Sequence, residues 1–525
     1  MEESKLMTKS TRNWIGLTAL SLGVFMALLD VTIVNVALPT MVRDFNESFN
    51  SVQWVLNAYS LVLGVTLLIV SKIGDMYGLK RVFVISLAVF VLASAVNGLA
   101  PNLLILDIGR GVQALGGAGM NALAMALVAV TFQGSKRGVA LGILGSVIGL
   151  SSASGPLVGG YLVAQFGWRS IFYVNIPIGI IAIILTMIYV DEVPDLSRSQ
   201  HIDFIGMILS AGSLFALIYG LILKESHQHW SWTSPQMLGW FGSAVVLFAL
   251  FIWAESRIKQ PMVNLAMFKN PHFVGTVMVA LALGAGIYSY NTYLTALMQN
   301  YMGYTALQAG TRQLTISIWS LILGPLTGYL GNRYSKKWMI SGSLFLGGIG
   351  FLMLANAMTV RVSFAQLWPG MVLMGITNGL VNPLLNSSGM EGVAVREMGM
   401  ASGLINVFRQ IGVTLGIVCL GLVQSNVYEH YLNQHIGQVS SMPKAAATGI
   451  HQALVEAGPF SGHAIAFSDR LSKMPFGHAI QQMVWQAYAN GTRAVTLTAA
   501  GIVVVGGICA AVLMRNHAVK TSQRD

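Results

Sequence analysis

Two apolar stretches of the chain each contain a charged side chain that could take part in proton transfer. Asp30 lies nine residues before Pro39, at the end of one stretch, and Arg110 lies eight residues after Asn102, at the start of another. At 1.5 Å per residue, helices over both stretches would place the two side chains roughly 12 to 13 Å from one surface. The sequence therefore predicts that they meet at one depth. Asp107 precedes Arg110 by three residues on the same helical face, where it could share the guanidinium or stay nearer water.

A charge inside hydrocarbon is costly and usually functional. Burial raises the pKa of a carboxyl group and a nearby arginine lowers it, so a pair of this kind changes its proton affinity when its members separate. A mobile pair of Asp30 and Arg110 is therefore predicted to act as a proton switch. The alternative is a static ion pair that only orders the two segments.

The composition excludes a water-soluble fold. Of the 525 residues, 54% are hydrophobic and 9% are charged, against about 25% charged in ordinary soluble domains. The two cysteines lie in apolar runs and cannot form a disulfide framework or a thiolate metal cage. No phosphate-binding loop and no nucleophile with an evident base is present. We therefore predict an all-α membrane protein that is not an enzyme, with no metal site and no cofactor, in which energy for transport would come from an ion gradient or from another subunit.

Apolar runs long enough to cross a bilayer predict fourteen membrane helices, an even count that puts both termini on one side. The runs cover residues 14–38, 52–72, 82–100, 103–131, 138–162, 170–190, 204–223, 237–254, 272–298, 307–330, 338–358, 366–389, 401–424 and 493–514. Most of the 30 Lys and Arg residues fall in loops on the side of the termini. Because basic residues accumulate in cytoplasmic loops, both termini are predicted to be cytoplasmic in a multi-pass protein of the cell membrane. The net charge of +11 thus encodes orientation and does not indicate nucleic-acid binding.

An internal repeat divides the chain into two bundles. Residues 71–80 align with 328–337, and residues 140–142 align with 401–403. The predicted organisation is a cytoplasmic N-terminus (1–13), a six-helix bundle (14–190), a linker with two inserted helices (191–270), a second six-helix bundle (271–514) that includes an external segment (425–492), and a cytoplasmic tail (515–525).

Two glycine-containing motifs have spacings that suggest moving parts. The first forms a tight cytoplasmic turn that could latch the two bundles, with an acidic residue able to cap a helix; an ordinary charged turn is the alternative. Its residues are Gly74, Asp75, Gly78, Lys80 and Arg81. The second predicts a bend or a close helix approach, with simple small-residue packing as the alternative. Its residues are Gly155, Pro156, Gly159 and Gly160.

Polar and aromatic side chains within the apolar runs suggest a central cavity for an amphipathic ligand. Each of them could instead form a helix-to-helix hydrogen bond or pack in the core. The candidates are Asn35, Asn57, Tyr59, Gln113, Asn121, Tyr288, Tyr290, Tyr293, Trp319, Asn378, Asn382, Asn386 and Arg409.

Taken in order, these motifs resemble the major facilitator superfamily, specifically the fourteen-helix drug:proton antiporters of the EmrB/QacA type. The resemblance rests on residues 29–39, 71–81, Arg110 with Gly111 and Gln113, residues 155–160, residues 168–179, and Asn406 with Arg409, Gln410 and Gly412. Ser71 and Leu79 depart from the usual loop motif, which implies a weaker latch. The runs 307–330 and 401–424 lack the carboxylates that some members use for dicationic drugs, and the second carries Arg409 instead.

The resemblance implies a secondary active exporter that exchanges external protons for amphipathic organic compounds by alternating access. Its expected partners are a small amphipathic substrate, protons and the lipid bilayer, with an adaptor protein of unknown identity as a further option. One alternative is a lipid or fatty-acid translocator on the same scaffold. Another is a membrane receptor that does not transport.

Overall fold

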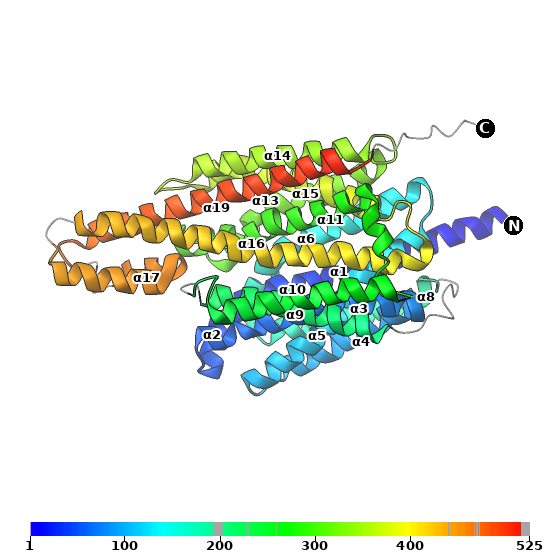
Figure 1. The fold of residues 1–525 in the computed structure, drawn as a ribbon, viewed down its shortest axis with the longest axis horizontal. Coiled ribbons are helices and arrows are strands. Elements are labelled where there is room, and N and C mark those ends of the chain that lie inside the picture. Colours follow the sequence, from blue (N-terminus) through cyan, green and yellow to red (C-terminus); the bar gives the residue numbers. More distant parts are fainter. Residues whose placement is uncertain are drawn as a thin grey trace.

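The structure, a computed structural model, describes residues 2–192, 203–227, 230–258, 260–438, 442–466, 468, 471 and 473–515 (Figure 1). All regular elements among these residues are helices, as the sequence predicts. The first part of the chain forms α1 (Glu2–Phe45), α2 (Phe49–Val52), α3 (Trp54–Tyr77), α4 (Leu79–Gly98), α5 (Leu103–Thr131), α6 (Ser135–Phe166), α7 (Ser170–Tyr173) and α8 (Asn175–Tyr189).

Two neighbouring helices come next, α9 (Phe204–Ser226) and α10 (Pro235–Arg257). After them come η1 (Leu265–Lys269), α11 (Pro271–Leu283), η2 (Gly284–Tyr288), α12 (Ser289–Ala296), η3 (Leu297–Tyr301), α13 (Ala306–Leu330), α14 (Lys336–Ala357), α15 (Phe364–Gly389), η4 (Val395–Glu397), α16 (Met398–His435), η5 (Ile436–Gln438), α17 (Lys444–Ala466) and α19 (Gly477–Leu513). The segment from α11 to η3 is one continuous rod with two π-helical stretches.

Eleven of the described helical segments are long and apolar enough to cross a membrane, or twelve if the bent α6 counts as one span. The protein is therefore a multi-pass membrane protein. Helices α13 and α15 have 25 and 26 residues, which is also enough to cross, but they do not reach the same apolarity. The count of fourteen spans stays a prediction.

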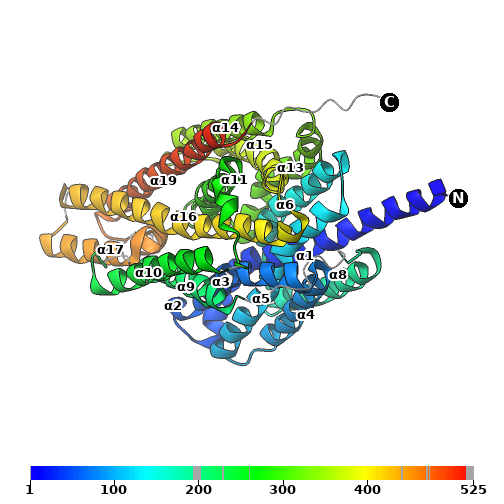
Figure 2. The ribbon, with the colours of Figure 1, turned by 45° about the vertical axis from the view of Figure 1, so that its right-hand side comes forward.

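The helices pack into two groups that meet along a seam. Helices α1, α3, α4, α5, α6 and α8 contact one another, and so do α11, α13, α14, α15, α16 and α19. We call these groups the first half and the second half. The seam is formed chiefly by α6 against α13 and by α3 against α16. The inserted helix α9 contacts both α3 and α16, so the pair α9–α10 lies along the outside of the seam (Figure 2).

The two ends of the molecule differ. Helix α1 begins and α19 ends at one end, which we call the terminal face (Figure 1). At the opposite end, α16 and α19 extend beyond their predicted spans and pack with α17 around a separate apolar core that includes Tyr428, Leu432, Leu454, Ile480 and Val484. The external segment predicted over 425–492 is therefore mainly helical where the structure describes it.

Small residues allow α6 and α13 to approach each other backbone to backbone. A Cβ atom added to Gly142 would lie 2.5 Å from the carbonyl oxygen of Gly324, and one added to Gly328 would lie 2.1 Å from that of Gly138. Both distances are far below van der Waals contact. Without a hydrophobic driving force between helices in lipid, such close packing is a main source of their association.

We expect Gly328→Ala to lower the free energy of unfolding by about 1–3 kcal/mol, because the added methyl group meets the backbone of α6 and cannot be relieved by a side-chain rotation. Thermal unfolding of the purified protein in detergent micelles measures the effect. The matched control is Gly342→Ala on α14, where nothing lies within 4 Å of the added carbon. An equal response of the two variants would contradict the close-packed seam.

Candidate functional site

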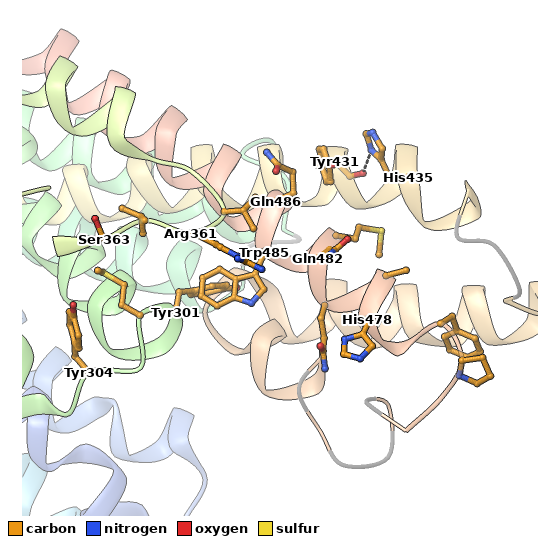
Figure 3. Close-up of a pocket in the computed structure, with 18 residues that line it drawn as sticks. Tyr301, Tyr304, Arg361, Ser363, Tyr431, His435, His478, Gln482, Trp485 and Gln486 are labelled. Atoms are coloured by element: carbon orange, nitrogen blue, oxygen red, sulfur yellow. Dashed lines mark hydrogen bonds between the residues drawn. The ribbon is translucent and has the colours of Figure 1, made fainter. Parts of the chain in front are cut away.

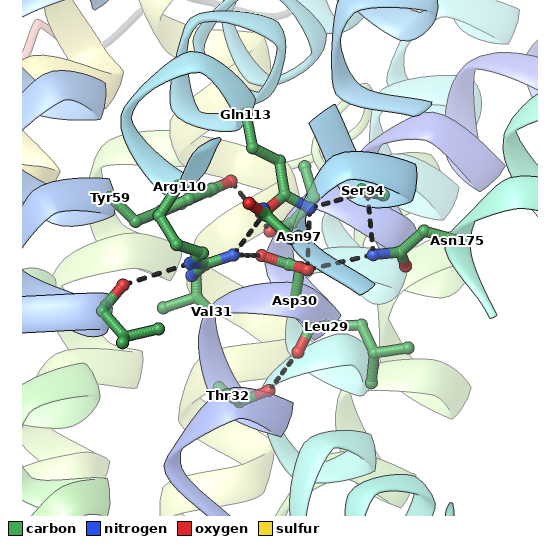
Figure 4. Close-up of polar contacts among 12 residues, drawn as sticks. Leu29, Asp30, Val31, Thr32, Tyr59, Ser94, Asn97, Arg110, Gln113 and Asn175 are labelled. Carbon is green, nitrogen blue, oxygen red and sulfur yellow. Dashed lines mark hydrogen bonds and ion pairs between the residues drawn. The ribbon is translucent and has the colours of Figure 1, made fainter. Parts of the chain in front are cut away.

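Asp30 and Arg110 form an ion pair inside the first half (Figure 4). Asp30 lies on α1, Arg110 lies on α5, and both side chains are 0% exposed. The Arg110 Nη1 donates to Oδ2 of Asp30. The shared depth that the sequence predicts for these residues therefore brings them into direct contact.

Amide side chains complete the coordination of the carboxylate. Its Oδ1 accepts a hydrogen bond from Gln113 at 3.0 Å and another from Asn175 of α8 at 3.0 Å. Both amides also donate to the hydroxyl of Ser94 on α4, at 2.8 and 3.4 Å. Three donors on one carboxylate offset the cost of burying its charge.

The guanidinium of Arg110 is held from several sides as well. Its Nε donates to the carbonyl of Val55 at 3.1 Å and its Nη1 donates to Oε1 of Gln113 at 2.7 Å. The ring of Tyr59 lies 4.3 Å from the guanidinium carbon, which adds a cation–π contact. Nη2 is buried with no hydrogen-bond partner. One donor of the cation is thus left over in the state that the structure describes.

Close contact between α6 and α1 borders this network. A Cβ atom on Gly155 would lie 2.1 Å from Oγ1 of Thr32, and one on Gly159 would lie 2.8 Å from the side chain of Ile33. These residues follow Asp30 directly on α1. The helix is also bent by 47° just before Gly155. The predicted bend and the predicted close approach therefore occur together, and Gly160 faces Leu307 at the start of α13.

The structure places some predicted residues outside the network and adds others. Asp107 makes no hydrogen bond to the pair, and its buried Oδ1 has no partner. Gln113, which the sequence analysis assigned to the substrate cavity, bridges the ion pair instead. Ser94 and Asn175 were missed as site residues, because single neutral polar residues are common in membrane helices. The only sequence signal was the place of Asn175 in the 168–179 motif.

The predicted gate motif joins the two halves at the terminal face. Asp75, near the end of α3, accepts hydrogen bonds from the backbone N–H groups of Gly399 and Met400 at 2.9 and 2.8 Å. These are the second and third residues of α16, in the second half. A carboxylate at a helix N-terminus satisfies otherwise unpaired donors and complements the helix dipole. Gly74 packs directly on Leu123 of α5.

The rest of this motif binds within its own half. Gly78 has φ of 107°, a conformation that favours glycine, and it turns the chain from α3 into α4. The backbone N–H groups of Lys80 and Arg81 both donate to the carboxylate of Glu192, each at 3.0 Å. The Lys80 ammonium donates to the carbonyl of Met187. Only Asp75 of this motif therefore bonds across the seam.

A second polar cluster at the terminal face lies after α15. Glu391 pairs with Lys336 and lies 3.5 Å from Nε2 of His272. Nδ1 of this histidine accepts from the backbone of Arg515, so Nε2 carries a proton. Next to it, Arg137 of α6 donates to the carbonyl of Met390, a further bond between the halves. Burial alone raises the pKa of Glu391, but the hydrogen bond from His272 and the charge of Lys336 outweigh it and lower the pKa to about 2.

The predicted cavity residues do not form one site. Tyr288, Asn378 and Asn382 bond to one another, Asn386 bonds to Arg409, and Asn121 bonds to Asn406 across the seam. The other predicted residues lie apart from these contacts. Asn35 is exposed, and Asn57 and Trp319 are half-buried. Tyr59 covers Arg110, Tyr290 bonds to Thr496, and Tyr293 bonds to the carbonyl of Ile417.

A large pocket of about 1320 Å³ lies at the end of the molecule opposite the terminal face. It opens between η3, the loop before α15 and the extensions of α16 and α19, with Tyr301, Arg361 and Trp485 on its walls (Figure 3). None of the predicted cavity residues lines it. Its position outside the predicted spans marks it as a feature of the external segment.

Comparison with known proteins identifies the family. A model described as Major Facilitator Superfamily matches residues 20–417, which is well over half of the chain. The chain belongs to the major facilitator superfamily. The resemblance seen in the sequence is thereby confirmed, and this superfamily member is a transporter and not an enzyme.

Its relatives include several resistance proteins. It is 34% identical to "Multidrug resistance protein Stp" of Mycobacterium tuberculosis, an alignment that covers 80% of this chain and 77% of the relative. It is 31% identical to the "Tetracenomycin C resistance and export protein" of Streptomyces glaucescens, covering 79% and 76%. A crystal structure of the human organic anion transporter TETRAN shares the fold with a TM-score of 0.61 over 94% of this chain and 99% of that one, at 13% identity.

The buried ion pair predicts strongly non-additive stability effects. Arg110→Gln alone leaves an uncompensated carboxylate and should cost about 3–5 kcal/mol. Adding Asp30→Asn should recover most of this loss, because two neutral amides then face each other. Unfolding of the purified variants in detergent measures the cycle. The matched control is the exposed pair of Asp44 and Arg169, for which the same substitutions should cost below about 1 kcal/mol. Additive losses of stability at both pairs would contradict the assignment of Asp30 and Arg110 as a buried ion pair.

The low pKa of Glu391 predicts a pH dependence. Its ordinary pKa is 4.5 and its pKa in the folded protein is about 2, so its contribution to stability is present above the ordinary pKa and is lost as the pH falls toward 2. At neutral pH, Glu391→Gln should destabilise the protein by up to about 3 kcal/mol, and this difference should shrink between about pH 5 and pH 2. Melting temperatures across this range, with Glu47→Gln as a control on an exposed residue, test it. A constant difference between variant and wild type would refute the effect.

Proposed function

We propose that the protein is a proton-coupled exporter of amphipathic organic compounds, working by alternating access between its two halves. The observation that carries the proposal is the fully buried pair of Asp30 and Arg110. A titratable charge in the interior of a membrane protein is costly, so its presence there indicates a functional role. Exchange of a proton at Asp30 would be that role.

The proposed cycle uses the contacts at the terminal face as a gate. This face is assigned to the cytoplasm of a cell-membrane protein, in line with the many basic residues of its loops. In the state described here, Asp75 and Arg137 bond across the seam. Breaking these few bonds would let the halves separate at this face, while small residues keep α6 and α13 in sliding contact.

Protonation provides the drive. When Asp30 takes up a proton from the external side, its attraction to Arg110 falls and the amides of Gln113 and Asn175 lose an ionised acceptor. The network that ties α1, α5 and α8 is then weaker. We infer that this change favours the transition that releases substrate outside, and that proton loss to the cytoplasm resets the pair.

The names of the relatives support the proposed class of substrate. Their names include multidrug resistance and the export of tetracenomycin C, which supports amphipathic organic compounds as cargo. The polar residues of α15 and α16 at the seam, between the two halves, are the proposed contact surface.

The deciding experiment is dye export from proteoliposomes under an imposed pH gradient. Wild type should export the dye, and Asp30→Asn should reduce the gradient-driven rate to the level of protein-free vesicles. Asp44→Asn makes the same chemical change in an exposed part of α1 and should leave the rate unchanged.

The double variant Asp30→Asn with Arg110→Gln separates the two interpretations of the pair. A proton switch predicts that it is stable but inactive, whereas a static ion pair predicts that it is stable and active. Undiminished export by Asp30→Asn would remove this residue from the mechanism. Transport of a labelled lipid in place of the dye would favour a lipid translocator.

A further inference from the structure

Arg409 is a second arginine deep in the membrane-spanning part of the protein. It lies eleven residues after the start of α16, about 16 Å along the helix, which is half of the roughly 30 Å of hydrocarbon. One turn before it, Asn406 donates to the carbonyl of Asn121 in the first half. Gln410, which follows Arg409 in the chain, lies beside Gly64 of α3. Arg409 therefore lies at the seam between the halves.

The surroundings of Arg409 contain more donors than acceptors. Its two terminal nitrogens donate to the amide oxygens of Asn406 and Asn386, each at a long 3.3 Å. Its Nε is buried and has no acceptor. The side-chain nitrogen of Asn386, a residue that is 0% exposed, also has none. Two unused donors thus flank the Arg409–Asn386 contact.

Among the residues that the structure describes, the charge of Arg409 is not neutralised. Within the described ranges, no carboxylate forms an ion pair with it, whereas Arg110 has Asp30 as its counter-ion. The polar groups beyond Asn386 along α15 are neutral: Tyr288 donates to both Asn378 and Asn382. Arg409 is half-buried, but its Nε is fully buried, and a cation with buried unpaired donors is costly unless an anion joins it.

From these features we infer that Arg409 and Asn386 form a subsite for an anionic oxygen group, a carboxylate, on the transported compound. The inference rests on the proposed function, since it names the chemical class of its cargo. A carboxylate that accepts from Nε of Arg409 and from the amide of Asn386 would satisfy both unused donors and neutralise the charge. The apolar part of the compound would extend along the seam.

This arrangement separates substrate from proton. Asp30 and Arg110 neutralise each other within the first half and are fully buried, whereas Arg409 belongs to the second half. A cationic compound would be repelled by Arg409 and would find Asp30 inaccessible. Substrate and proton would then be coupled through the movement of the halves and not through competition for one carboxylate.

The test compares two dyes that differ in one group, a carboxylated rhodamine and its methyl ester. Binding to the purified full-length protein in lipid nanodiscs is followed by fluorescence anisotropy, without any pH gradient. Wild type should bind the acid at least tenfold more tightly than the ester. Arg409→Gln should lose this preference by weakening the acid alone, and Arg409→Lys should retain part of it. Asn386→Leu should weaken the acid less than Arg409→Gln does.

The control is Arg257→Gln, which removes an exposed arginine at the end of α10 and should change neither affinity. Equal binding of both dyes by wild type would overturn the inference even if every variant failed to fold. So would an equal loss for both dyes in a folded Arg409→Gln. Failure of the proposed function has a different signature, because it would abolish gradient-driven export of both dyes while leaving their equilibrium binding measurable.

Discussion

The ion pair of Asp30 and Arg110 is the interaction on which the first half depends. Two opposite charges without contact to solvent need polar groups around them, and α3, α4, α5 and α8 supply these groups to the pair formed with Asp30 of α1. The same dependence makes the half sensitive to the protonation of a single carboxyl group. Removing one charge would change the balance for five helices at once, which is how the proposed proton exchange would act on a structure of this size.

The seam has the opposite character. Where α6 meets α13, the contact is made by glycines and backbone atoms, which are tight but not directional. At the terminal face, Asp75 caps α16 and Arg137 reaches Met390. Deeper in the seam, Asn406 donates to the carbonyl of Asn121 and Ser317 donates to that of Gly149. A joint with close packing along its length and single, breakable hydrogen bonds across it suits rocking better than it suits a rigid assembly.

The sequence predicted what hydrophobicity and charge control. Helix positions followed from apolar runs, and Asp30 met Arg110 because depth in a membrane helix can be counted from its end. Prediction failed where contacts depend on tertiary structure. Ser94 and the cluster of His272 with Glu391 are distant in sequence and individually unremarkable. The extensions of α16 and α19 beyond the predicted spans were also missed, because hydropathy shows which residues cross the bilayer but does not show where a helix ends.

The two arginines inside the membrane-spanning part show how a repeated architecture can divide its tasks. Both Arg110 and Arg409 lie on long helices and are flanked by amides, but in the part of the chain that the structure describes only Arg110 pairs with a carboxylate. Where the counter-ion belongs to the chain, the site can be controlled by a proton. For Arg409 we infer that an anionic group of the cargo supplies the neutralising charge, so that the occupancy of this site depends on the cargo. Such a division would let one half sense the gradient while the other recognises the compound.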